Sequence, residues 1–269
     1  MIVFPPLLIG LGLAVGTYGT LIGVGGAVVL LPALILLYPE ASPSTLTSIS
    51  LAIVFINALS GTIAYSHQRR IDHRTGALFA LATVPGTVIG VWATQFLSRE
   101  TFSLTFGIML ILFSVLLQFR PQKRLPQLFF SGSTTRTLVD ARGETFSYSF
   151  NMPVGIVLSF AVGFLAGLLG IGGGIIHVPA LIYLFSFPVH IATATSHFIL
   201  VFTALTGSLT HAVSDVYSQT WQLLLWLAVG IIPGAQIGAR LSQRVRGILI
   251  VRLLALALGV MGVRLLFVR

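Results

Sequence analysis

The sequence predicts an all-α, multi-pass membrane protein with about eight transmembrane helices arranged as two tandem repeats. The chain of 269 residues is 56% hydrophobic and only 8% charged, whereas soluble domains carry about 25% charged residues. Apolar runs of about 20 residues, the length that crosses a bilayer as a helix, recur along the whole chain. A glycine-rich segment near the start also appears again after the middle. Because the runs are continuous and do not alternate with polar residues, a β-barrel is disfavoured.

The duplication is visible without gaps in its first landmark. Residues 23–34 (GVGGAVVLLPAL) match residues 170–181 (GIGGGIIHVPAL) at an offset of 147. Two further landmarks, beginning at Ala58 and Pro85, recur at Ala204 and Pro233. Apolar halves interrupted by Gly and Pro at the same place are typical of secondary transporters. We therefore divide the chain into a first transmembrane repeat (1–119), a polar inter-repeat linker (120–151) and a second transmembrane repeat (152–269).

Each half contributes four apolar segments. They cover residues 7–38, 45–66, 76–97 and 102–119, then 153–187, 191–213, 221–241 and 248–267. The first segment of each half would form a helix of roughly 50 Å at 1.5 Å per residue, against a hydrocarbon core of about 30 Å. The glycine clusters therefore predict a broken or re-entrant first helix in each repeat. The alternative is a continuous helix that kinks at Pro32 or Pro179.

The linker and the loops between segments carry most of the basic residues. We expect the linker to be partly disordered or to lie on the membrane surface. With eight spans, the positive-inside rule favours a cytoplasmic location for both termini. The two halves disagree, however, because the basic loop follows the second span in one half and the third span in the other. The disagreement vanishes if each broken helix gives its half an odd number of membrane segments. The two repeats would then be inverted relative to each other in the membrane.

Composition excludes several function classes. The net charge of +9 comes from basic residues in loops, where they contact lipid headgroups, so no nucleic-acid partner is expected. The chain has no Cys, which excludes disulfides, thiolate metal sites and a cysteine nucleophile. Common hydrolase, nucleotide-binding and metalloprotease motifs are absent. His177, His197 and His211 are not spaced on one helix face. We therefore expect no enzymatic activity, no metal and no cofactor.

The centres of the predicted spans lack carboxylates. All six acidic residues lie in loops or at span ends, although cation transporters and proton relays commonly place one at mid-membrane. A transported ion would therefore be held by backbone dipoles, hydroxyls, amides and histidines. An interrupted helix exposes unpaired N–H groups with partial positive charge, which suit a small anion. The predicted substrate-binding glycines are Gly23, Gly25, Gly26, Gly170, Gly172, Gly173 and Gly174.

Close helix packing is the alternative role for glycine in a membrane. Five spaced pairs fit that role: Gly12/Gly16, Gly19/Gly23, Gly86/Gly90, Gly163/Gly167 and Gly234/Gly238.

Polar residues near the glycine clusters complete the predicted binding site. The candidates are Ser50, Asn57, His177, Thr195, Ser196 and His197. The alternatives are hydroxyls that bond back to their own helix and buried neutral histidines with one hydrogen bond. A histidine that titrates near pH 6.5 would attract an anion and carry its proton, so the site is compatible with proton coupling.

The doubled motif G-x-G-G-[G/A]-x-x-x-x-P-A-L, in an eight-segment chain with a polar middle linker, resembles the sulfite exporter TauE/SafE family of bacterial membrane permeases. The resemblance covers both halves of the chain. It implies a two-repeat helical fold in the bacterial inner membrane and a small sulfur-containing anion, such as sulfite or an organosulfonate, as substrate. Two departures, Ala27 in place of a third glycine and His177 in the second copy, leave the substrate open within the family.

The expected function is thus a secondary transporter that moves a small anion across the inner membrane by alternating access. Its partners would be the anionic substrate, with proton coupling as an option, and the lipid bilayer. Two alternatives stay open. One is a permease for a different small metabolite, and the other is a membrane assembly factor without transport activity. Oligomeric state and direction of transport are not defined by the sequence.

Overall fold

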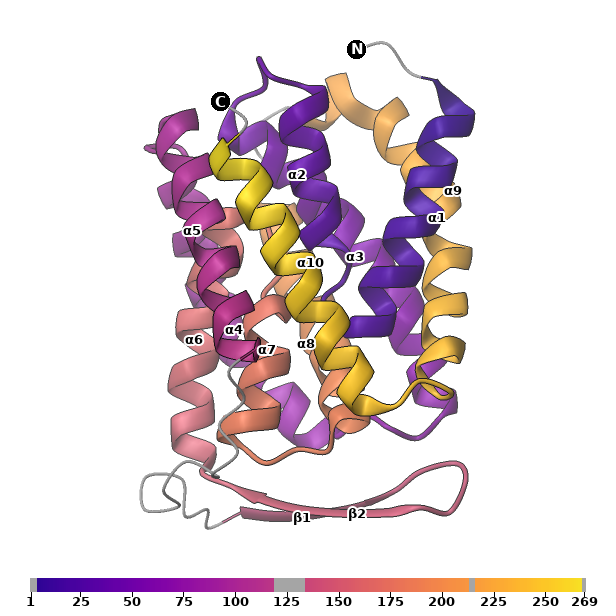
Figure 1. Cartoon of the computed structure of the whole chain (residues 1–269). Coiled ribbons are helices and arrows are strands. Elements are labelled where there is room, and N and C mark those ends of the chain that lie inside the picture. The colour runs from indigo at the N-terminus through magenta and orange to yellow at the C-terminus, as the bar shows by residue number, and fades with distance from the viewer. Residues whose placement is uncertain (1–3, 119–133, 213–215, 268–269) are drawn as a thin grey trace.

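The computed structural model describes residues 4–118, 134–212 and 216–267, and it confirms an all-α, multi-pass architecture (Figure 1). The first half contains α1 (Pro5–Ile22), α2 (Ala27–Leu37), α3 (Pro43–His67), α4 (His73–Thr94) and α5 (Arg99–Gln118). The second half contains α6 (Met152–Leu169), α7 (Gly174–Pro179), the π-helical turn η1 (Ala180–Leu184), α8 (Val189–Ala212), α9 (Val216–Ser242) and α10 (Gly247–Phe267). Eight of these helices are long and apolar enough to cross a membrane.

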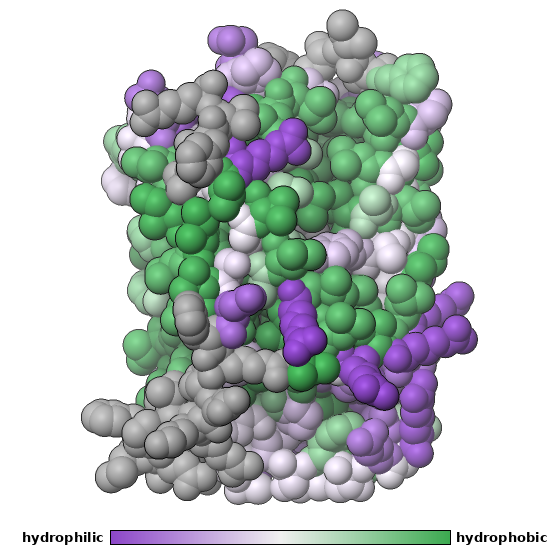
Figure 2. Space-filling view, in the orientation of Figure 1, coloured by the Kyte–Doolittle hydropathy of each residue, from purple (hydrophilic) through white to green (hydrophobic). Residues whose placement is uncertain are grey.

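The side wall of the molecule is suited to lipid. Figure 2 shows a mostly hydrophobic wall, with hydrophilic residues concentrated toward its lower right edge. Large apolar side chains such as Leu81, Phe96 and Val157 are exposed on the molecule, at 67%, 71% and 71%. A soluble protein avoids an apolar surface of this extent. The chain is therefore a multi-pass membrane protein.

The helices of the two halves are interleaved. Helix α1 packs along α9, and α6 packs along α4, so the first helix of each half packs against a helix of the other half. Figure 1 shows both termini at one end of the molecule, where α1 begins and α2 ends, whereas α6 begins and α7 ends at the opposite end. The α5–α10 and α3–α8 pairs join equivalent helices of the two halves.

Spaced glycines explain the close contact within these pairs, as one of the two alternative roles predicts. A Cβ atom on Gly90 would lie 2.8 Å from the amide nitrogen of Leu168 in α6, and one on Gly16 would lie 2.7 Å from the carbonyl oxygen of Ile231 in α9. Only glycine permits backbones to approach this closely. The packing role is thus confirmed for these positions. Gly19 differs, because it faces Gly26 within the same half.

The polar linker contains an element that the sequence prediction missed. Strands β1 (Thr134–Val139) and β2 (Thr145–Phe150) form an antiparallel hairpin at the end opposite the termini (Figure 1). Tyr148 and Phe150 of β2 are buried against Phe79, Phe185 and Phe187 of the helical core. Residues 134–150 of the linker are therefore ordered and not disordered, because an apolar face packs the hairpin against the helical bundle. Residues 119–133 lie outside the described residues.

Candidate functional site

Both predicted helix interruptions occur at the glycine clusters. Helix α1 ends at Ile22 and α2 begins at Ala27, while α6 ends at Leu169 and α7 begins at Gly174. The connecting glycines at positions 23, 25 and 26, and at 170, 172 and 173, all have φ between 67° and 94°. This left-handed region is open mainly to glycine, which explains the composition of the clusters. Pro32 lies inside α2 and Pro179 ends α7, so neither proline makes the break.

The two breaks meet inside the molecule. A Cβ atom on Gly174 would lie 2.7 Å from the Cα atom of Val24 and 2.9 Å from the carbonyl oxygen of Gly23. Gly25 and Gly172 face the same two side chains, Val54 of α3 and Leu200 of α8. All residues of both breaks are buried. Segments 147 residues apart in the sequence thus form one buried centre.

Several backbone amides at this centre have no hydrogen-bond partner among the described residues. Gly23, Val24 and Gly25 donate to carbonyls in the last turn of α1. The amides that follow make no hydrogen bond with any of the described residues. These are Gly26, Ala27 and Val28 at the first break, and Gly172, Gly173, Gly174 and Ile175 at the second. Buried amides are nearly always paired in proteins, so two facing groups of free donors at helix starts form a candidate anion site.

The serines predicted to touch substrate have another role. The Ser50 hydroxyl donates to the Gly170 carbonyl at 2.6 Å, and the Ser196 hydroxyl donates to the Gly23 carbonyl at 3.1 Å. Each half thereby holds the break of the other half. A hydroxyl has one proton, so neither serine has a hydrogen left to donate to an anion in this arrangement. In this arrangement both hydroxyls support the broken backbone, and their contact with substrate stays a prediction.

Removing one of these supports should destabilise the fold. Ser50→Ala leaves the buried Gly170 carbonyl without a partner, which costs about 1–3 kcal/mol. Ser66→Ala, at an exposed position on the same helix, should leave stability unchanged. Thermal unfolding in detergent, followed by tryptophan fluorescence, measures both variants. Equal midpoints for the two variants would contradict the supporting role of Ser50.

A polar cluster beside the first break joins two predicted residues with two that were missed. The Thr20 hydroxyl donates to the Asn57 side-chain oxygen at 2.9 Å and lies 3.3 Å from Nε2 of His197, while the Tyr65 hydroxyl donates to the Thr20 carbonyl at 2.7 Å. Asn57 and His197 are fully buried. The Asn57 amide nitrogen and the His197 Nδ1 make no hydrogen bond with the part of the chain that the structure describes. Thr20 lies three residues before Gly23, and this proximity to the first break could have identified it as a site residue.

The remaining predicted residues lie apart from one another. At the second break, His177 Nε2 is 3.3 Å from the Ser159 hydroxyl, and its Nδ1 has no partner and faces Gly173. Thr195 was predicted at the binding site, but its hydroxyl accepts a hydrogen bond from the Asp72 amide at 3.1 Å. Asp72 caps the start of α4, at the hairpin end of the molecule. Thr195 therefore positions a loop in this arrangement, and its place in the binding site stays a prediction.

Fixed charge is scarce around the breaks. Within the described ranges, Arg70 is the only Arg or Lys that is buried, and it lies in the loop between α3 and α4. Arg252, which belongs to α10, is exposed. No group of three or more potential metal-ligating side chains comes together in the part of the chain that the structure describes. The centre is thus rich in hydrogen-bond donors and poor in charge.

Comparisons with known proteins agree with this architecture. The family model described as sulfite exporter TauE/SafE matches residues 8–265. The chain is 35% identical to the probable membrane transporter protein YunE of Bacillus subtilis, over 97% of both chains. It is 27% identical to the probable membrane transporter protein YjnA of the same species, over 87% of this chain and 89% of that one. A probable membrane transporter of Methanocaldococcus jannaschii is 24% identical over 96% of this chain and 93% of its own. No solved structure matches the chain. The chain, a multi-pass membrane permease by its relatives and its helices, belongs to the sulfite exporter TauE/SafE family.

Proposed function

We propose that this permease moves a small sulfur oxyanion, such as sulfite or an organosulfonate, across the bacterial inner membrane. The observation that carries the proposal is the meeting of two helix breaks whose amides have no partner among the described residues. Helix N-termini bind anions through free N–H groups and the positive end of the helix dipole. Glycine lets the anion approach the backbone closely. The family name supports sulfite in particular.

Alternating access is the proposed mechanism. The pairs α1–α9 and α4–α6 are each held together by glycine contacts between backbones, so each pair would move as a unit. Helices α1 and α6, which lead into the two breaks, begin at opposite ends of the molecule (Figure 1). This arrangement is typical of inverted repeats that rock around a fixed central site. The free amides would then face one side of the membrane at a time.

We propose that the hairpin end faces the cytoplasm. Arginines gather at that end: Arg69, Arg70, Arg74, Arg136, Arg142, Arg240, Arg244 and Arg246. Cytoplasmic loops are enriched in Lys and Arg. Both termini would then lie outside the cytoplasm, in contrast to the expectation from eight simple crossings. The basic loops of the two halves fall on one side, because each half begins with a helix that breaks and returns.

Flux measurements test the proposed function. Purified protein in liposomes should move radiolabelled sulfite. Methanesulfonate should compete for that flux, whereas dimethyl sulfone, which is similar in size but uncharged, should not. Competition by the neutral compound, or flux no higher than in empty liposomes, would overturn the proposal.

The Asn57 side chain allows a second test of anion binding. Asn57→Asp keeps the oxygen that accepts from Thr20 and replaces the unpartnered NH₂ group with a second carboxylate oxygen. An added negative charge beside the site should lower sulfite flux by at least roughly 100-fold, since a buried like-charge contact costs several kcal/mol. Asn57→Ala, which removes one donor and adds no charge, should lower it only about tenfold. Equal fluxes for the two variants would exclude an anion near Asn57.

A further inference from the structure

The β1–β2 hairpin closes the arginine-rich end of the helical bundle. Its buried aromatic residues pack against the loop that precedes α8 and against α4. The Tyr148 hydroxyl donates to the Asp72 carboxylate at 2.9 Å. The Ala141 amide donates to the Gln68 carbonyl at 3.0 Å. The hairpin is thus attached to the α3–α4 loop through both its strand and its turn.

A buried ion pair stands at the centre of this attachment. The Nε and Nη2 atoms of Arg70 donate to Oδ2 of Asp140 at 3.2 and 3.0 Å. The two side chains are 5% and 1% exposed. The other carboxylate oxygen of Asp140 accepts from the amides of Arg142 and Glu144 at 2.8 and 3.1 Å. Asp140, in the turn of the hairpin, thereby accepts hydrogen bonds from two of the three guanidinium nitrogens of Arg70.

The pairing leaves donors unused. Within the described ranges, Nη1 of Arg70 is buried without a hydrogen-bond partner, and so is Nδ1 of His190 in the first turn of α8. His190 lies within electrostatic range of Arg70, Arg142 and Asp140. A buried guanidinium with an unused donor is costly, because desolvation is not fully repaid. The same planar group binds an oxyanion through two parallel hydrogen bonds, in the geometry with which it binds a carboxylate.

We propose that Arg70 is a docking site for an oxyanion at the hairpin end, and that Asp140 holds this site while it is empty. This proposal rests on the anion transport proposed above. An incoming oxyanion replaces the Asp140 carboxylate on Arg70. Repulsion between the two anions then releases the hairpin and opens the path to the breaks. The hairpin is a gate that the transported class of anion unlocks by competition.

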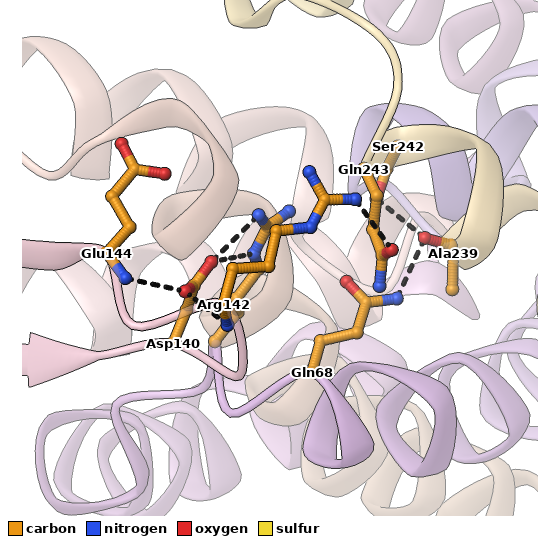
Figure 3. Close-up of polar contacts among 8 residues, drawn as sticks. Gln68, Asp140, Arg142, Glu144, Ala239, Ser242 and Gln243 are labelled. Atoms are coloured by element: carbon orange, nitrogen blue, oxygen red, sulfur yellow. Dashed lines mark hydrogen bonds and ion pairs between the residues drawn. The ribbon is translucent and has the colours of Figure 1, made fainter.

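The contacts around Arg70 connect the gate to the helices that would move. The Gln68 side chain donates to the Ala239 carbonyl near the end of α9 at 2.9 Å, and Arg142 donates to Gln243 at 3.1 Å (Figure 3). On the other side, the Asp72 amide donates to Thr195 of α8, two residues before His197. Release of the hairpin therefore acts on α9 and on the helix that lines the central site.

The ion pair should persist over the physiological pH range. Burial raises the pKa of Asp140, but the hydrogen bonds from Arg70, Arg142 and Glu144 and the Arg70 charge together hold that pKa below its usual 3.8. Because the pKa of Asp140 is lowered in the docked hairpin, ionisation of Asp140 stabilises docking at pH values above the usual pKa. This stabilisation is lost as the pH falls through the lowered pKa. His190 and Tyr65 are further titratable groups within electrostatic range of Arg70. A spin label on Thr137→Cys, at an exposed site of β1, should stay immobilised from pH 8 to pH 5. Increased mobility of the label at pH 5 would show that Asp140 does not hold the hairpin.

Cysteine accessibility tests the gate without relying on transport. The chain has no native Cys, so Ala194→Cys supplies a single thiol. Ala194 is fully buried beside Ile71 of the α3–α4 loop and Ala239 of α9. We expect Asp140→Asn to raise the rate of modification by a membrane-impermeant maleimide at least about tenfold, the effect of losing one charged hydrogen bond. Glu144→Gln, which makes the same carboxylate-to-amide change on an exposed side chain and keeps the backbone amide that contacts Asp140, should leave the rate unchanged. An unchanged rate in Asp140→Asn would overturn the gate.

The same thiol reports on the proposed docking site. Methanesulfonate, an oxyanion that does not react with maleimide, should raise the modification rate of Ala194→Cys. It should have no effect in the Arg70→Gln background. A rate that methanesulfonate raises equally in both backgrounds would show that Arg70 does not bind the anion.

A reversible cross-link connects the gate to flux. Gln68 and Ala141 are joined by a backbone hydrogen bond of 3.0 Å, which makes these two positions candidates for an engineered disulfide. Oxidation of the Gln68→Cys/Ala141→Cys variant should stop sulfite flux, and reduction should restore it, while each single variant stays active in both conditions. Flux that survives oxidation would exclude the gate, provided that mass spectrometry shows the disulfide. Absence of flux in the unmodified protein would instead count against the proposed function.

Discussion

Gly173→Leu is expected to abolish sulfite transport while leaving the protein folded. Gly173 has φ of 94°, and a side chain there would meet Val162 at 3.0 Å and Nδ1 of His177 at 3.4 Å. These are side-chain atoms that can shift, so the fold should tolerate the change at a cost of about 1–3 kcal/mol in backbone strain. The leucine would cover the amides of residues 172–174. Loss of two charge-assisted hydrogen bonds to the anion, each worth about 1.5–3 kcal/mol, lowers binding by at least about 100-fold.

The control for this experiment is a leucine that replaces a glycine elsewhere in the chain. Gly10 lies on α1, and no neighbouring atom would come within 4 Å of a Cβ atom added there, so Gly10→Leu should transport at the rate of the unmodified protein. Elution as a monodisperse peak on size exclusion shows that both variants are folded. A folded Gly173→Leu variant that transports sulfite normally would exclude the anion site at the second break.

Gly90→Leu is expected to have the opposite profile, with its main effect on folding. A Cβ atom at this position would meet the carbonyl oxygen of Phe164 and the amide nitrogen of Leu168. These are backbone atoms of α6, which cannot move unless the α4–α6 pair separates. Overpacking of this kind costs roughly 3 kcal/mol or more, and for a chain of this size each kcal/mol lowers the unfolding midpoint by about 2–4 °C. We expect a loss of yield and a midpoint lower by about 6–12 °C.

Gly10→Leu again supplies the comparison, since it adds the same side chain at an exposed position with open space around it. Thermal unfolding of the two variants in one detergent measures the difference. A Gly90→Leu midpoint equal to that of Gly10→Leu would mean that α4 and α6 do not pack as described.

Sequence patterns identified the features that depend on local chemistry. Runs of apolar residues defined the spans, and the glycine clusters located both helix breaks, because only glycine readily adopts the left-handed backbone found at positions such as 25 and 172. The spacing of Gly86 and Gly90 indicated a helix contact. None of these patterns indicates which helix packs against which, however. That α4 packs along α6 and α1 along α9 follows from the three-dimensional arrangement of the two halves.

The hairpin and its ion pair were missed for a related reason. Phe146, Tyr148 and Phe150 alternate with serines, and such alternation is a strand signal, but the basic composition of the linker was interpreted as surface or disorder. The partnership of Arg70 with Asp140 joins residues 70 positions apart, and no local pattern contains it. The supporting roles of Ser50 and Ser196 were not predicted, because a sequence does not show that the carbonyl of the opposite break accepts their only proton.

The central claim is that free backbone amides at the two breaks hold the anion. Solid-state NMR of protein labelled with ¹⁵N-glycine in lipid bilayers tests it directly. Addition of methanesulfonate should shift the amide resonances of Gly26, Gly172, Gly173 and Gly174, while those of the packing glycines Gly86 and Gly234 stay in place. Saturating methanesulfonate that competes for sulfite flux, yet leaves the four break resonances unmoved, would contradict the claim.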